Sequence, residues 1–435
     1  MITRRQLLTT GAALLAGGAA LSQATRAVAA ATGPAATQPP QPPAPGASYT
    51  PVVTLNGSTL PWRMEHGIKV FHLIAEPVKR EFAPGMVVNC WGYNGSTPGP
   101  TIEAVEGDRV RIYVTNRLPE RTAVHWHGVL LPNGMDGVGG LTQPHIPPGK
   151  TFAYEFTLDR HGTFMYHPHS DEMFQMAMGM QGFLVVHPRQ APPPRIDRDY
   201  LIMLHNWYVE PGTYTPNPMV MTDFNIWTMN SRIFPGVDPM VARTGERVRI
   251  RIANISMHDH PMHIHGFNMT VTGTDGGWLP ASAQWPETTV LVPVGNVRVV
   301  EFVAHAPGDW AFHCHKSHHT MNAMSHDVPN LYGVNLEGVD QRISRLVPQY
   351  MSMGRNGMGD MQDMAEMGMR LPENTLPMMT GKGPFGQLEM GGMFTVIKVR
   401  DDLAAGDYRD PGWYTHPEGT VAWEVPDEEV KRLFG

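Results

Sequence analysis

The polar and apolar residues of the chain alternate with the period of β-strands. Residues 109–114, with the sequence Arg-Val-Arg-Ile-Tyr-Val, form one of many short alternating runs between Tyr49 and Pro188, and Gly or Pro separates one run from the next. Successive side chains of a strand point to opposite faces, so each run predicts a strand with one buried face. Numerous short strands with frequent turns are typical of β-sandwiches. We therefore expect an all-β fold with little helix.

The pattern occurs twice because the chain contains an internal repeat. Residues 107–112 (Gly-Asp-Arg-Val-Arg-Ile) recur as residues 245–250 (Gly-Glu-Arg-Val-Arg-Ile), and Pro192-Pro193-Pro194 lies between the two copies. A chain of 435 residues can hold two domains that each bury a core. We predict a first domain over residues 51–190 and a second over residues 191–435.

The N-terminal segment carries an export signature. Thr3-Arg4-Arg5-Gln6-Leu7-Leu8 precedes an apolar stretch that ends at Leu21, and Ala27-Val28-Ala29 is a small-residue cleavage pattern. We expect residues 1–30 to be a cleaved twin-arginine signal, which makes the protein periplasmic or secreted and free of the membrane after cleavage. A membrane anchor is the alternative, but the apolar stretch is short for one. Residues 31–50 are rich in Pro and Ala and predict a disordered linker.

Composition narrows the chemistry. The net charge of -7 provides no basic surface for nucleic acid, so we exclude nucleic acid as a partner. The chain has 21 His and 30 Met but only 2 Cys, too few for a disulfide framework. Copper is the metal that suits both imidazole and thioether ligands.

Histidine pairs occur at equivalent places in the two repeats. Each pair has the pattern His-x-His, and strand alternation points its two imidazoles to the same side. The four pairs lie in His125-Trp126-His127, His167-Pro168-His169, His263-Ile264-His265 and His313-Cys314-His315. One pair can arise by chance on a surface strand, but four pairs in two repeats predict a metal cluster.

Cys314 adds a second metal site. Its side chain points away from those of His313 and His315, so this tripeptide joins two sites through a few covalent bonds. Two imidazoles, one thiolate and a weak axial thioether are the ligand set of blue copper. The partners of Cys314 in this set are His260, His319 and Met324. His318 is the alternative to its neighbour His319, but the spacing of five residues from Cys314 favours His319.

These motifs give the sequence a resemblance to multicopper oxidases of the two-domain laccase type. The resemblance covers nearly the whole chain after the signal. It rests on His125-Trp126-His127-Gly128, His167-Pro168-His169, residues 260–266, and His313-Cys314-His315 with His319 and Met324. It implies two cupredoxin-like Greek-key β-sandwich domains. It also implies one type 1, one type 2 and two type 3 coppers per functional site, with dioxygen as the electron acceptor.

The resemblance assigns each ligand to a copper. His260, Cys314, His319 and Met324 would hold type 1 copper, and His125 and His263 would hold type 2 copper. One type 3 copper would be bound by His127, His167 and His315, and the other by His169, His265 and His313. We expect electrons to enter through an exposed edge of His319 and to pass from Cys314 to His313 and His315.

Asp136 is a further candidate that the resemblance brings forward. It matches an acid that in related proteins hydrogen-bonds water near the cluster and helps to deliver protons. A plain turn role in Met135-Asp136-Gly137 is the alternative.

The first domain lacks a blue copper site of its own. Opposite the four type 1 ligands, in the same order, the repeat places Thr122, Pro168, Met173 and Met178. About ninety residues separate His169 from His260, too few for a third sandwich. Each domain then contributes four imidazoles to one cluster. Similar two-domain oxidases are homotrimers with a cluster at each subunit interface, and we expect a homotrimer here.

A methionine-rich insertion occupies about residues 345–392. Its methionines are Met351, Met353, Met358, Met361, Met364, Met367, Met369, Met378 and Met379. Thioethers prefer Cu(I), which suggests a cuprous oxidase with a role in copper tolerance. A short apolar helix packed on the sandwich explains the spacing equally well. A second cluster, formed by Met173, Met176, Met178 and Met180, fits core packing better.

Cys90 and the overall function leave alternatives open. If Cys314 binds copper, Cys90 is a buried free thiol, whereas a disulfide between the two would abolish the blue site. We predict a multicopper oxidase whose donor is a phenolic molecule or a metal ion such as Cu(I). A copper nitrite reductase would need fewer imidazoles and a thiolate in the first domain, where Pro168 stands. A non-catalytic copper-binding resistance protein would not need all four histidine motifs.

Overall fold

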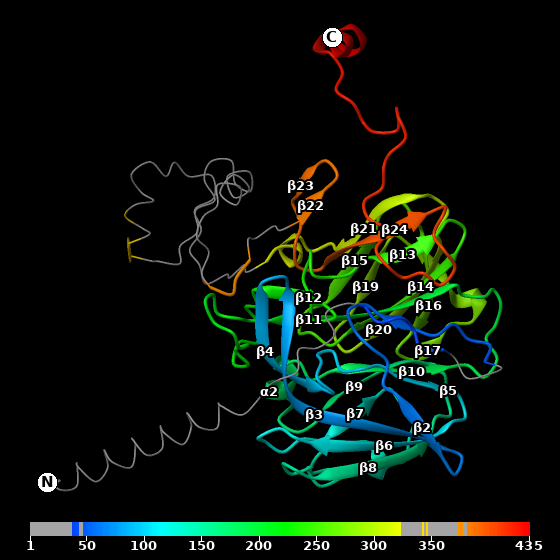
Figure 1. The fold of residues 1–435 in the computed structure, drawn as a ribbon, viewed down its shortest axis with the longest axis vertical. Helices are drawn as coiled ribbons and strands as arrows, with labels where there is room; N and C mark the ends of the chain where they lie inside the picture. The colour runs from blue at the N-terminus through cyan, green and yellow to red at the C-terminus, as the bar shows by residue number, and fades with distance from the viewer. Residues whose placement is uncertain (1–36, 43–46, 323–341, 343–344, 347–372, 377–380) are drawn as a thin grey trace, which may run out of the picture.

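The computed structural model describes residues 37–42, 47–322, 342, 345–346, 373–376 and 381–435 (Figure 1). The predicted signal, part of the predicted linker, Met324 and the nine methionines of the insertion lie outside these residues. The described chain consists mainly of strands, which confirms the all-β fold. None of its helices is long and apolar enough to cross a membrane.

The first sandwich packs two sheets against each other. One sheet has the order β2-β3-β6-β8 with β4 on β3, and the other has the order β5-β10-β9-β7. Trp126, Phe156 and Leu184 belong to the core between them. The elements are β2 (Trp62–Glu65), β3 (Ile68–Ala83), β4 (Met86–Tyr93), β5 (Ile102–Val105), β6 (Arg109–Asn116), β7 (Val124–His127), η1 (Asn133–Met135), β8 (Thr151–Thr157), β9 (Gly162–Pro168), α2 (Glu172–Ala177) and β10 (Gly182–His187).

The second sandwich is larger. Its first sheet has the order β1-β11-β14-β20-β16-β17, with β12 on β11 and β18 on β16, and its second has the order β13-β24-β21-β15-β19. The elements are β1 (Val53–Thr54), β11 (Arg198–Trp207), β12 (Ile226–Met229), β13 (Met240–Arg243), β14 (Arg247–Asn254), β15 (His260–Ile264), β16 (Met269–Thr274), β17 (Gly277–Trp278), η2 (Ala281–Ala283), β18 (Trp285–Glu287), β19 (Thr289–Val292), β20 (Val297–Val303), β21 (Gly308–Cys314), η3 (Ser317–Thr320), β22 (Gly381–Gly383), β23 (Gly386–Leu388), β24 (Phe394–Arg400) and α5 (Asp427–Phe434). Strands β22 and β23 form a separate hairpin, and α5 stands away from the sandwich in Figure 1.

The two sandwiches are held together by a buried apolar layer. Met165 and Phe183 of the first domain belong to one cluster with Leu201, Ala253 and Val299 of the second. The long hairpin of β3 and β4 also reaches across, because Phe82 and Val88 share a cluster with Trp207 of β11. Burial of this apolar surface opposes rotation of one domain against the other.

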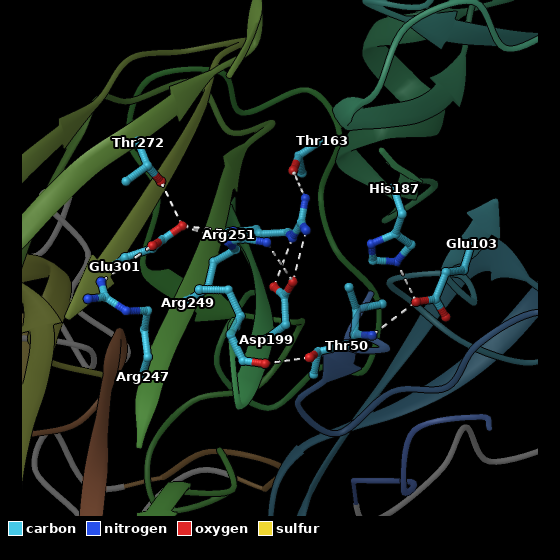
Figure 2. Close-up of polar contacts among 12 residues, drawn as sticks. Thr50, Glu103, Thr163, His187, Asp199, Arg247, Arg249, Arg251, Thr272 and Glu301 are labelled. Carbon is cyan, nitrogen blue, oxygen red and sulfur yellow. Dashed lines mark hydrogen bonds and ion pairs between the residues drawn. The ribbon is translucent and has the colours of Figure 1, made fainter. Parts of the chain in front are cut away.

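A charged network is buried in the same interface (Figure 2). Arg251 of β14 donates to both carboxylate oxygens of Asp199 at 2.8 Å and to the hydroxyl of Thr163, in the first domain, at 2.7 Å. Arg249 donates to Glu301 at 2.8 Å. The alternating run that begins β14 predicts one solvent-facing side, whereas Arg249 and Arg251 are buried. The reason is that the first domain covers the face of β14 that an isolated sandwich would expose.

Candidate metal centres

The histidine pairs lie on neighbouring antiparallel strands in both domains. In the first domain His125 of β7 stands opposite His167 of β9. In the second domain His263 of β15 stands opposite His313 of β21. The residues between the paired histidines, such as Trp126 and Ile264, are buried in the cores. Strand alternation therefore separates metal-binding side chains from core side chains, as the spacing predicts.

The imidazoles of the first domain gather into one set of four. The nearest nitrogens of His127 and His167 lie 3.3 Å apart, and the rings of His125 and His169 have centroids 5.6 Å apart. His125, His127 and His167 each offer a nitrogen within 4.8 Å of the others. Burial lowers the pKa of His167 to about 3, and the neighbouring imidazoles add to this effect. Neutral imidazoles are the form that binds metal ions.

The second domain holds a matching set. The Nε2 atoms of His265 and His313 lie 3.1 Å apart, and the rings of His263 and His315 have centroids 5.3 Å apart. Burial and the neighbouring imidazoles lower the pKa of His265 and of His313 as well. The two sets are therefore alike in geometry, and in each of them burial lowers the pKa of at least one imidazole.

Backbone carbonyl groups orient four of these rings. His125 Nδ1 lies 2.8 Å from the carbonyl oxygen of Asp136, and His263 Nδ1 lies 2.8 Å from that of Thr288. His167 and His313 make the same contact with the carbonyl oxygen of the next residue, at 3.0 and 2.9 Å. A carbonyl can only accept, so in each ring Nδ1 carries the proton and Nε2 keeps its lone pair for a metal.

Asp136 acts here through its backbone as well as its side chain. Its carboxylate Oδ1 lies 3.5 Å from His125 Nδ1, farther than its carbonyl oxygen. Gly137 has a φ of +85°, and a Cβ on this residue would lie 1.8 Å from the carbonyl oxygen of Val124. Only glycine lets the turn approach β7 this closely. The turn that the sequence offers as an alternative for Asp136 thus positions a candidate ligand.

The ring contacts of the histidines fall into two separate sets, one in each domain. Ring contacts join the four histidines of each set to one another, and in the described structure none joins a histidine of one set to a histidine of the other. In the described residues, each domain therefore presents its own set of four imidazoles.

His260, Cys314 and His319 form a separate buried site. Cys314 Sγ lies 3.6 Å from His260 Nδ1 and 3.4 Å from His319 Nδ1, and these two nitrogens lie 3.0 Å apart. Burial raises the pKa of the Cys314 thiol to about 12. A bound cation would reverse that effect, because metal ions stabilise the thiolate. Two imidazoles and one thiolate converging in an apolar pocket fit type 1 copper, and Met324, the fourth expected ligand, lies outside the described residues.

The prediction that His319 has an exposed edge is wrong. His319 is fully buried, and its Nε2 atom makes no hydrogen bond within the described part of the chain. Trp227 stacks on the ring at a centroid distance of 4.7 Å, and His258 stacks on it at 5.5 Å with 7° between the planes. His318 contacts the ring edge-on at 4.3 Å and 75°. His258 is not among the residues predicted from the sequence, although His258 and His260 repeat the His-x-His spacing of the other pairs.

The corresponding place in the first domain is filled by a hydrogen bond. Thr122, which aligns with His260, donates to the side-chain oxygen of Gln175 at 2.7 Å, and both residues are buried. The repeat alignment had placed Met173 here, but Met173 is exposed on α2. Gln175 of α2, and not Met173, contacts the residue that aligns with His260, as His319 contacts His260 itself. An amide and a hydroxyl leave no soft ligand for copper at this place.

Cys90 and Cys314 belong to different core clusters. Cys90 is a free thiol packed with Val78, Val88 and Trp207, and Cys314 is also free. Burial raises the pKa of Cys90, which makes the thiol unreactive. The structure therefore contains no disulfide between Cys90 and Cys314.

Comparison with known proteins identifies the family. Two multicopper oxidase family models match residues 75–191 and residues 210–331, together more than half of the chain. The chain therefore belongs to the multicopper oxidase family.

Particular relatives match only in part. Copper resistance protein A of Pseudomonas syringae pv. tomato is 42% identical over 114 residues, which are 26% of this chain and 18% of that protein. A probable nitrite reductase-hydroxylamine oxidoreductase fusion protein of Kuenenia stuttgartiensis is 30% identical over 264 residues, 58% of this chain and 30% of that protein. The chain thus spans less than a third of either relative. The crystal structure of a blue copper oxidase from Nitrosomonas europaea superposes with a TM-score of 0.57 and 26% identity, covering 76% of this chain and 85% of that one.

Proposed function

We propose that the protein couples the one-electron oxidation of a reducing substrate to the four-electron reduction of dioxygen to water. The observation that carries this proposal is the register of β15 and β21. Cys314 stands opposite Met262 in the core, and its neighbour His313 stands opposite His263 on the cluster side. One tripeptide thus belongs to a blue-copper site and to a set of imidazoles.

The residues divide the work between the two sites. His260, Cys314 and His319 would hold type 1 copper, which accepts single electrons, and the eight paired histidines would hold the type 2 and type 3 coppers, which bind and reduce dioxygen. Cys314 connects the sites through its bonds to His313 and His315. Asp136 orients His125 and places a carboxylate beside it, where it can hold a proton. Oxygen uptake with a reducing substrate tests the proposal directly, and copper-loaded protein that consumes no oxygen would refute it.

A second chain is proposed to complete the cluster. Each chain presents one set of four imidazoles from each domain, and the buried interface between its domains opposes a rotation that would merge them. Large apolar side chains are exposed near both sets. Leu291 and Val294 lie on and just after β19, which pairs with the strand of His263, and Leu130 follows His127 closely in sequence. A subunit interface at this place would cover these side chains. A head-to-tail homotrimer would join unlike sets at three equivalent interfaces.

Mixing two inactive variants separates a cluster between chains from a cluster within one chain. One variant carries His125→Ala with His127→Ala, and the other carries His263→Ala with His265→Ala. Each alone should keep the blue absorption, because the type 1 ligands are intact, but should not reduce dioxygen. Every mixed trimer contains one interface with two intact sets, so mixed trimers isolated by two different tags should recover about a third of the wild-type oxygen uptake. Mixed trimers without activity would contradict assembly between chains.

The electron donor is proposed to be a phenolic molecule or a metal ion such as Cu(I), with a role in copper tolerance. The methionine-rich insertion supports Cu(I), because thioethers are soft ligands. We expect replacement of its nine methionines by leucine to lower the turnover of Cu(I) and to leave that of a phenolic donor unchanged. Oxygen uptake with each donor measures this, and Met219→Leu, an exposed methionine outside the insertion, is the matched control. Equal Cu(I) turnover in the two variants would rule out the insertion as a Cu(I) site.

Copper nitrite reductase is a second candidate because of the Kuenenia stuttgartiensis relative. The first domain argues against a nitrite reductase, because Thr122 and Gln175 occupy the place where such an enzyme would need a blue-copper site. Anaerobic assays with nitrite and a reductant should therefore give no turnover, while the same protein consumes oxygen. A storage protein would show neither reaction.

A further inference from the structure

The buried position of His319 separates the proposed type 1 site from solvent. His319 is fully buried, whereas His258, whose ring lies against it, is partly exposed. Electron transfer weakens steeply as the distance between donor and acceptor increases. A donor at the surface therefore needs a group that brings the electron to the ring of His319.

His258 has the geometry for this role. Its ring lies parallel to that of His319, with 7° between the planes and 5.5 Å between the centroids. Trp227 is the other stacked ring, but it is buried and offers no contact to a donor. His318 is partly exposed, but it meets His319 edge-on at 75°. Among these rings His258 alone combines a parallel stack with access to solvent.

The surrounding structure fixes His258 in this position. Its carbonyl oxygen accepts hydrogen bonds from Asn254 Nδ2 at 2.8 Å and from Ser256 Oγ at 2.9 Å. Ser256 Oγ also lies 2.7 Å from Nε2 of His260, so one hydroxyl positions both a copper ligand and the segment that carries His258. Phe224 packs edge-on against the His258 ring at 5.3 Å. A ring held from several sides keeps its stack with His319.

We propose that His258 is the electron-entry residue of this protein, the point at which the donor docks and from which the electron reaches His319. The inference rests on the proposed oxidase function. The donor loses one electron and the type 1 site gains it, while His258 forms no bond and undergoes no net change in oxidation state. A proton released by a phenolic donor passes to the solvent.

The proposal is tested by following the reduction half-reaction alone. In the absence of dioxygen, a hydroquinone bleaches the blue absorption of copper-loaded protein, and stopped-flow spectroscopy gives the rate. His258→Leu keeps His319 covered but removes the stacked ring. We expect this rate to fall about tenfold, equivalent to about 1.4 kcal/mol in the barrier. His258→Phe, which restores a ring, should recover most of the rate, and His318→Leu should leave it unchanged.

Two further measurements separate electron entry from a structural effect. The visible spectrum and the reduction potential of the type 1 site, and the rate at which dioxygen reoxidises reduced protein, should be the same in His258→Leu and in the wild type. If leucine alters the spectrum, His258→Gln provides the same comparison without the bulk of leucine. Reduction of the ringless variant at the wild-type rate, or an equal loss in His318→Leu, would overturn the role of His258. Wild-type protein that dioxygen cannot reoxidise would instead overturn the oxidase function.

Discussion

Replacing Cys314 with serine should abolish both the intense blue absorption and the consumption of dioxygen while leaving the fold intact. The blue colour depends on a thiolate ligand, and Cys314 Sγ lies 3.4 and 3.6 Å from the two imidazole nitrogens that would share the metal. The side chain also begins the covalent path to His313 and His315. Serine is similar in size, so the apolar pocket should not collapse. Visible spectroscopy, copper content and oxygen uptake measure the three parts of this prediction.

Cys90→Ser is the matched control for that experiment. Cys90 is buried like Cys314 but packs among apolar residues of the β3–β4 hairpin and β11. We expect the control to keep the colour and the oxygen uptake, with at most a modest loss of stability. A Cys314→Ser protein that remains blue would refute the assignment of the type 1 site.

Asp199→Ala should lower the free energy of unfolding by about 3–5 kcal/mol, because it leaves the buried guanidinium of Arg251 without a carboxylate and removes one of the two carboxylates that Arg249 contacts. Burial alone would raise the pKa of Asp199, but Arg251 and Arg249 hold it below its ordinary value. The folded state therefore favours the charged form, and this contribution is present at neutral pH and lost as the pH falls through the lowered pKa. Urea unfolding at neutral pH, followed by tryptophan fluorescence, measures the change.

Asp275→Ala provides the comparison for Asp199. Asp275 also pairs with an arginine, Arg298, but at 3.6 Å and with nearly half of its side chain exposed. An exposed pair of this kind contributes about 0–1 kcal/mol. Equal destabilisation by the two substitutions would show that the buried network does not hold the domains together.

Much of the site could be predicted because strand alternation is a local property. His125 and His127 face one side and Trp126 the other whatever the rest of the chain does. The repeat then extends the argument from one domain to the next. The all-β fold and the grouping of the imidazoles both follow from this short-range rule.

The remaining features depend on contacts between distant segments. Arg251 is buried because another domain covers β14, and no pattern within β14 encodes that cover. His319 is enclosed by Trp227, which lies about ninety residues earlier in the chain. Helix α2 buries Gln175 against Thr122 and leaves Met173 exposed, which the spacing of the repeat does not predict. In each case, a residue that is distant in sequence determines the burial or the contacts of the side chain, and the sequence spacing does not reveal that residue.

The hydrogen bond between Thr122 and Gln175 has a consequence for the number of sites at which electrons can enter the protein. With that place closed to metal, the described residues contain one proposed type 1 site, although they form two sandwiches of the same design. In the proposed reaction, this site must then accept four electrons in succession for each oxygen molecule that is reduced. We therefore expect a donor that carries electrons in pairs to gain no advantage, because the proposed site accepts them one at a time.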